Sequence, residues 1–209
     1  MGQYYSIINL SKKQYMNSWD YNSGAKLTET CYIGPDMHSN EYLGTLSYLL
    51  QNDWAGDRVI FIGDYANKDW ADETKCGDTK PKEFARALYE EFKDEIPKTK
   101  YSPSLYDLTD AYTPYKEQHD EKIPRFLINN HTKEYVDLTK LASVPCFNEM
   151  FYYPLSLLLA IGNGLGNGDY HGNDENDIGY WCADSQYISF SAKKPQGYNE
   201  LSDYFVEKE

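Results

Sequence analysis

The sequence predicts an α+β fold in which hairpins build a mixed or antiparallel sheet and two main helices cover it. Two stretches rich in Tyr and Ile surround short polar turns, as the strands of β-hairpins do. Two other segments carry apolar residues at helical spacing. The chain has 209 residues, of which 41% are hydrophobic and 21 are Tyr, so it is long enough to bury a core. We expect a single domain over residues 1–209.

The N-terminal part predicts a hairpin, a helix and a strand, in that order. Residues 4–10 and 15–19 are rich in aromatic and β-branched side chains and flank a polar turn, which predicts the hairpin. A helix is expected over about 40–52, capped by Ser39 or Asn40, because its apolar residues share one face. The apolar run 58–62 predicts a buried strand that is followed by Gly63 and Asp64.

The middle of the chain predicts a second helix and a long loop. Pro81 suits the first turn of a helix over about 82–95, which carries Phe84, Leu88 and Phe92 on its inner face. Residues 98–122 alternate Tyr, Pro and charge without a clear period, so we expect a loop with one helical turn at 105–110.

The last third of the chain predicts a second hairpin and a closing strand. Residues 125–129 and 134–138 flank a polar turn, as in the first hairpin. The apolar run 155–161 is short enough to be either a strand or a helix. A glycine-rich loop over 162–172 follows, and 187–190 predicts a strand.

An internal comparison suggests two related halves, at 1–97 and 123–209. Residues 8–15 and 128–135 share Ile, Asn, Lys and Tyr at the same offsets. Each hairpin is also followed by a Trp-x-x-Asp sequence that precedes a strand, at 54–57 and 181–184. The alternative is that similar turn chemistry produces similar hairpins without duplication. If the repeat is real, a ligand cleft is expected between the halves.

The charge of the chain limits its partners. The net charge is -13, and the 20 Lys and Arg residues are scattered, which argues against direct binding of nucleic acid or of an anionic membrane. A basic protein partner or a cation is compatible with this charge. The Met-Gly-x-x-x-Ser opening also fits N-myristoylation at Gly2, although a supporting basic patch is absent.

Cysteine usage predicts a reducing compartment. The four Cys residues are far apart and form no Cys-x-x-Cys pair, so neither a zinc ribbon nor a disulfide framework is indicated. No secretory signal opens the chain, and no apolar run has the length of a membrane span. We therefore expect buried, reduced thiols in a cytoplasmic protein.

The glycine-rich loop is the strongest candidate for a site. Its pattern fits neither a dinucleotide-binding loop nor a P-loop, and the following residues do not match an EF-hand. The loop is compatible with a less regular site for a divalent cation. Hard oxygen donors and one imidazole would come from Asp169, His171, Asp174 and Asp177, around Gly164, Gly166 and Gly168. The alternative is a solvated loop whose Asn and Asp side chains bond their own backbone.

A second candidate is a pair of carboxylates. Asp64 follows the strongest predicted strand and Asp169 ends the glycine run, so the two could face each other across a cleft and serve acid–base chemistry. Asp after a strand is also a common turn residue. No serine-nucleophile or metalloprotease motif supports an enzyme.

The opening Gly2-Gln3-Tyr4-Tyr5, the hairpin Asn129–Leu138 and the loop Gly162–Gly172 together resemble a family of uncharacterised microbial proteins. The resemblance implies one family over both ends and the middle of the chain, and it implies no activity. Members of that family tend to carry Arg where this chain has Leu165, Ala183 and Ser185. Any anion-binding role of those arginines is therefore not carried over.

Two functions remain as expectations. The first is an acidic, Tyr-rich binding protein, of the kind that phages or mobile elements encode to inhibit a basic partner. The alternative is a cation-dependent enzyme or a small-ligand binder that uses a cleft with Asp64, Asp169 and His171.

Overall fold

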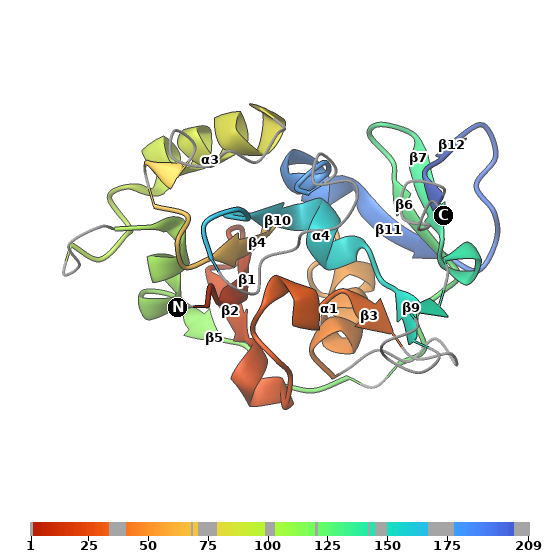
Figure 1. The fold of residues 1–209 in the computed structure, drawn as a ribbon, viewed down its shortest axis with the longest axis horizontal. Coiled ribbons are helices and arrows are strands. Elements are labelled where there is room, and N and C mark those ends of the chain that lie inside the picture. Colours follow the sequence, from red (N-terminus) through yellow and green to blue (C-terminus); the bar gives the residue numbers. More distant parts are fainter. Residues whose placement is uncertain are drawn as a thin grey trace.

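The computed structural model has the predicted α+β architecture, with strands at its centre and helices on either side (Figure 1). It describes residues 2–33, 41–67, 69–70, 79–98, 103–119, 121–141, 143–144, 150–166 and 178–202.

The largest sheet has five strands in the order β10-β4-β1-β2-β5. These are β1 (Tyr5–Asn9), β2 (Gln14–Asn17), β4 (Val59–Gly63), β5 (Thr113–Pro114) and β10 (Ala160–Ile161). Strands β1 and β2 form the predicted hairpin, and β4 pairs with β1 antiparallel. The two edge strands, β5 and β10, both pair in parallel. The sheet is therefore mixed, as expected.

Two helices, α1 (Glu41–Gln51) and α3 (Thr79–Phe92), lie on opposite sides of this sheet in Figure 1. Successive side chains of a strand point to opposite faces. Accordingly Ile7 packs in the cluster that contains the apolar face of α1, whereas Ile8 packs in the cluster that contains Leu88 and Phe92 of α3. Because both faces are covered, every residue of β1 and β4 is buried, which explains the continuous apolar sequence of β4.

A second mixed sheet has four strands in the order β11-β6-β7-β12. Its strands are β6 (Phe126–Asn129), β7 (Glu134–Asp137), β11 (Ile188–Ser191) and β12 (Asn199–Glu200). The hairpin β6–β7 and the strand β11 were expected, whereas the two-residue strands β5 and β12 were not. A third, antiparallel sheet joins β3 (Tyr32–Ile33), β9 (Met150–Tyr152) and β8 (Ser143–Val144).

The two mixed sheets share one pairing plan. The series β4-β1-β2-β5 and β11-β6-β7-β12 both run antiparallel, antiparallel and parallel. The hairpin turns place Lys13 and Lys133 at φ of 54° and 56°. The strands do not follow the predicted half boundaries, because β5 lies between the halves and β10 of the second half joins the first sheet. The pseudo-repeat stays a prediction.

Three boundaries differ from expectation. Helix α3 ends at Phe92 rather than near residue 95, and the next residues form a turn in which the N–H groups of Glu95 and Ile96 donate to the Phe92 carbonyl. The run 155–161 contains both alternatives, helix α4 (Leu155–Leu159) and then β10. The predicted strand 15–19 stops early, because the Asn17 side chain caps a 3-10 helix, η1 (Ser18–Tyr21).

The remaining 3-10 helices are short. They are η2 (Leu27–Glu29), η3 (Leu105–Asp110), η4 (Leu138–Lys140) and η7 (Cys182–Tyr187), and η3 is the helical turn expected at 105–110. The predicted caps Ser39 and Asn40 lie outside the described residues. Among the described helices, none combines the length and apolar character needed to cross a membrane.

Candidate functional site

The carboxyl ends of the neighbouring parallel strands β4 and β10 meet at one edge of the five-stranded sheet. Gly63 ends β4 and Gly162 follows β10. A Cβ placed on Gly162 would lie 3.3 Å from the Gly63 Cα, so the two backbones approach closely at this point. Gly162 also adopts a φ of 112°, which only glycine adopts readily. Carboxyl ends of parallel strands are a frequent location for ligands.

The side chain of Gln3 packs against the glycines at this edge. Gln3 is completely buried, and among the described residues neither its side-chain nitrogen nor its side-chain oxygen has a hydrogen-bond partner. Cβ atoms at Gly63 and Gly162 would collide with its amide, and one at Gly166 would lie 2.9 Å from its backbone nitrogen. Buried polar groups are almost always hydrogen-bonded, so an unpaired amide is a marker of function or of stored strain.

Asp64, predicted as a catalytic or metal-binding carboxylate, lies at the same edge. Its Oδ1 accepts a hydrogen bond from the backbone N–H of Tyr4 (3.0 Å), and its own N–H donates to the Tyr4 carbonyl (2.9 Å). These bonds extend the ladder between β1 and β4 by one residue. This Asp64 oxygen therefore has a structural partner, in line with the turn interpretation of this residue.

The glycine loop starts beside Gly63, the residue before Asp64. Gly164, with a φ of 106°, and Gly166 belong to the described residues. The predicted Gly168, Asp169, His171, Asp174 and Asp177 lie outside them, so the pairing of Asp64 with Asp169 stays a prediction. Within the described ranges, no three His, Cys, Asp or Glu side chains are grouped so that they could hold a metal ion.

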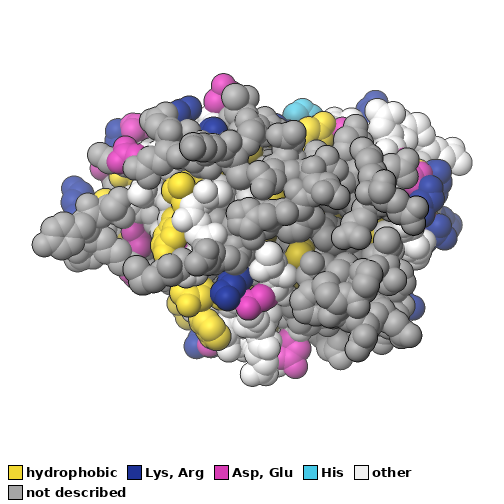
Figure 2. All heavy atoms as spheres, viewed as in Figure 1, with side chains coloured by type: hydrophobic (Ala, Val, Ile, Leu, Met, Phe, Trp, Pro, Cys, Tyr) yellow, Lys and Arg dark blue, Asp and Glu magenta, His cyan; other side chains and the backbone are white. Residues whose placement is uncertain are grey.

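Exposed apolar side chains surround this edge. We call Tyr4, Trp19 and Leu165 the hydrophobic edge; their exposed fractions are 42%, 66% and 37%. The rings of Tyr4 and Trp19 are 6.3 Å apart, and Leu165 precedes the glycine that packs on Gln3. Two of the four large hydrophobic side chains that the described residues expose, Tyr4 and Trp19, thus lie together, and Leu165 is next in sequence to a glycine that contacts the residue before Tyr4. Figure 2 shows a strip of hydrophobic side chains on the side where Figure 1 has the N-terminus.

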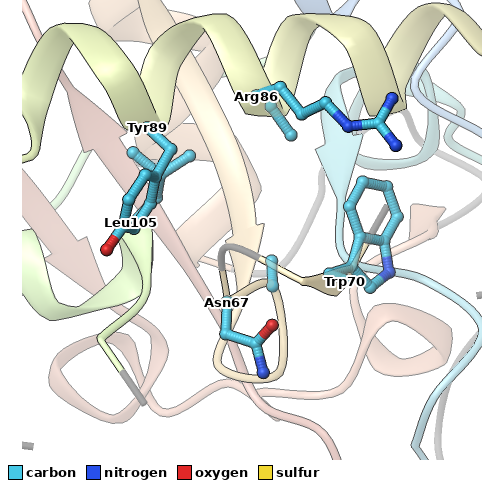
Figure 3. A pocket seen from close by; sticks show the side chains of 7 residues that line it. Asn67, Trp70, Arg86, Tyr89 and Leu105 are labelled. Carbon is cyan, nitrogen blue, oxygen red and sulfur yellow. The ribbon is translucent and has the colours of Figure 1, made fainter. Parts of the chain in front are cut away.

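A small pocket lies between α3 and the segment after β4 (Figure 3). Arg86 extends from α3 over the ring of Trp70, and Tyr89, Leu105 and Asn67 line the rest. The pocket encloses about 10 Å³, which is the space of roughly one water molecule. We therefore regard it as a packing gap under the helix rather than a ligand site.

A second polar cluster, at the turn of the β6–β7 hairpin, was not predicted. His131 contacts Asp184 of η7, with 2.8 Å between Nδ1 and Oδ1. The other carboxylate oxygen of Asp184 is 3.4 Å from Lys80 Nζ and 3.3 Å from Asn129 Nδ2. The Asp184 side chain is 7% exposed, whereas the His131 side chain is 62% exposed. A buried carboxylate thus holds an imidazole that remains open to solvent.

The charge state of this cluster follows from its contacts. Burial acts to raise the pKa of Asp184, but the hydrogen bond from His131 and the charge of Lys80 outweigh it and hold the pKa below its ordinary value. The sequence contained one usable signal, because Trp181-x-x-Asp184 aligns with Trp54-x-x-Asp57. Its position beside the hairpin turn depends on a contact between residues 53 positions apart.

The described cysteines, Cys31 and Cys182, are buried and form no disulfide, as expected; Cys76 and Cys146 lie outside the described residues. No model of a known protein family, no curated protein and no solved structure matches this chain.

Proposed function

We propose that the protein is a cytoplasmic interaction protein that binds a basic partner through the hydrophobic edge of Tyr4, Trp19 and Leu165. The observation that carries this proposal is the exposure of Trp19 at 66%, with the exposed ring of Tyr4 6.3 Å away. Tryptophan and tyrosine are enriched among the residues that dominate binding energy at protein interfaces. Grouped exposed apolar side chains are typical of interaction sites, whereas isolated ones are not.

The charge of the chain supports a basic partner. The net charge is -13, from 33 acidic residues against 20 basic ones. On the face in Figure 2, described acidic and basic side chains are interspersed. A partner with an apolar anchor and flanking Lys or Arg would meet a complementary net charge.

Selection from a library of short random peptides displayed on phage tests this proposal. We expect the enriched peptides to be basic and to contain a bulky apolar residue, and we expect salt to weaken their binding. Trp19→Ser should reduce affinity by about 30-fold, which is the roughly 2 kcal/mol of an interface hot spot. Trp19 is exposed, so the substitution should leave folding intact.

Tyr187→Ser is the matched control, because Tyr187 is 42% exposed but lies at η7, away from the hydrophobic edge. The control should bind the selected peptides as wild type does. Neutral or acidic peptides, insensitivity to salt, or equal binding to Trp19→Ser would contradict the proposal.

A second function is favoured by the unpaired Gln3 amide beside Asp64. We propose as the alternative a small-ligand or divalent-cation site at the edge formed by β4 and β10, with Asp169, His171, Asp174 and Asp177 as further donors. A thermal-unfolding scan with calcium, magnesium, manganese, zinc and nucleotides tests it. A ligand at 100 times its dissociation constant adds about 2.7 kcal/mol of stability. A shift that Asp169→Ala removes would support the site, and no shift under any condition would exclude it.

A further inference from the structure

His131 is held in one orientation by its contact with Asp184. Because the pKa of Asp184 is lowered, its carboxylate is ionised at neutral pH and can only accept hydrogen bonds. The proton between the two groups therefore belongs to His131 Nδ1. In the neutral imidazole the lone pair is then on Nε2, on a side chain that is 62% exposed.

The surroundings of the imidazole offset the negative charge of Asp184. Lys80 lies 3.4 Å from the second oxygen of Asp184, so its charge compensates the carboxylate. Lys80 is fixed there by the Tyr180 carbonyl (2.5 Å) and by the Tyr180 ring, whose centroid is 4.9 Å from Nζ. The exposed ring of Tyr187 lies 4.9 Å from the imidazole and restricts its rotation.

The first sheet shows which parts of this cluster the hairpin itself needs. There Asn9 donates to Asp57 (2.8 Å) as Asn129 donates to Asp184, and Lys12 lies 3.5 Å from the same Asp57 carboxylate. An Asn–Asp contact with a nearby lysine therefore accompanies this turn where no imidazole is present. The second cluster has in addition an exposed imidazole, whose Nε2 has no hydrogen-bond partner among the residues that the structure describes.

We propose that His131 Nε2 is a phosphoryl-acceptor site. The Nε2 lone pair attacks the phosphorus of a small donor of the acyl phosphate or phosphoramidate class and forms an N–P bond. The bond from phosphorus to the donor breaks, and carboxylate or ammonia leaves with the electron pair. The proton stays on Nδ1, where Asp184 stabilises the positive charge that develops on the ring. Asp184 is a positioning residue in this step, since it touches only the imidazole.

Two reagents on the full-length protein test the proposal. Phosphoramidate supplies an anionic phosphoryl group, and diethyl pyrocarbonate measures nucleophilicity with a neutral electrophile. Peptide mapping by mass spectrometry reports each histidine separately. His119 is the internal control, because its Nε2 contacts the Tyr115 hydroxyl (2.9 Å) and its ring stacks on Tyr48.

We expect an acid-labile phosphoryl group on His131, formed at least about 10-fold faster than on His119, and absent in His131→Gln. Asp184→Asn should slow labelling by about 10-fold, as loss of a carboxylate behind a histidine does elsewhere. Lys80→Met should slow phosphoramidate more than diethyl pyrocarbonate, which separates a charge effect from lost folding. Labelling of His131 no faster than of His119, modification by diethyl pyrocarbonate alone, or unchanged rates in a folded Asp184→Asn variant would overturn the proposal.

Discussion

Replacing Gln3 with Met tests whether the buried amide at the β4–β10 edge is truly unpaired. Gln3 is completely buried, and within the described part of the chain its amide nitrogen and oxygen have no hydrogen-bond partner. Leaving a buried polar group unsatisfied costs about 1–3 kcal/mol. Met has a similar length, has no group that needs a hydrogen bond and adapts to irregular spaces. The variant should therefore be more stable than wild type by about 2 kcal/mol.

Calorimetry and urea unfolding followed by Trp fluorescence measure this difference. For a chain of this size, each kcal/mol corresponds to about 2–4 °C, so the midpoint should rise by roughly 4–8 °C. Gln14→Met is the matched control, because Gln14 accepts a hydrogen bond from the indole of the buried Trp54 (3.0 Å). That variant should lose about 1–3 kcal/mol.

A Gln3→Met variant that is less stable than wild type by more than about 1 kcal/mol would show that the amide has a partner and refute the reasoning. If the variant is more stable and also loses a cation- or ligand-induced thermal shift, Gln3 is retained for binding at the expense of stability.

Three further perturbations have defined outcomes. Glu134→Gln should lower the free energy of unfolding by about 1–3 kcal/mol. The buried carboxylate accepts hydrogen bonds from the Trp181 indole N–H (3.0 Å) and from two hydroxyls, and an amide cannot accept all three. A change below about 0.5 kcal/mol in urea unfolding would contradict this. Gly162→Ala should lower the free energy of unfolding by about 1–3 kcal/mol, because alanine is strained at a φ of 112°. An unchanged melting temperature would contradict this prediction. Burial acts to raise the pKa of Glu200, but hydrogen bonds, above all from Lys140, lower it to about 2. Its contribution to stability is therefore present above about pH 4.5 and is lost as the pH falls toward 2. In Glu200→Gln the free energy of unfolding should depend less on pH in that range, and an unchanged pH profile would argue against the ion pair.

Local patterns predicted the elements that local interactions form. The hairpins, α1, α3 and β4 each bury a stretch whose apolar spacing is visible in the sequence, and a turn of Asn and Lys residues is sufficient to reverse each hairpin. The strand boundary that failed, at Asn17, was set by a side-chain cap. Strands β5 and β12 were missed because two residues carry no periodicity, and their partners lie 65 residues or more away in the chain.

Some candidate sites follow from local sequence, as those elements do, and others follow only from tertiary contacts. Sequence alone indicated Asp64, the glycine loop and the acidic, Tyr-rich character of the chain, since these depend only on composition and spacing. Only the tertiary structure placed Gln3 among three glycines and His131 against Asp184. Both contacts join segments that are far apart in sequence, and burial removes competing water from Gln3 and Asp184. No local sequence pattern reports this desolvation. It removes water as a hydrogen-bond partner of the Gln3 amide and strengthens the hydrogen bond between the Asp184 carboxylate and the imidazole.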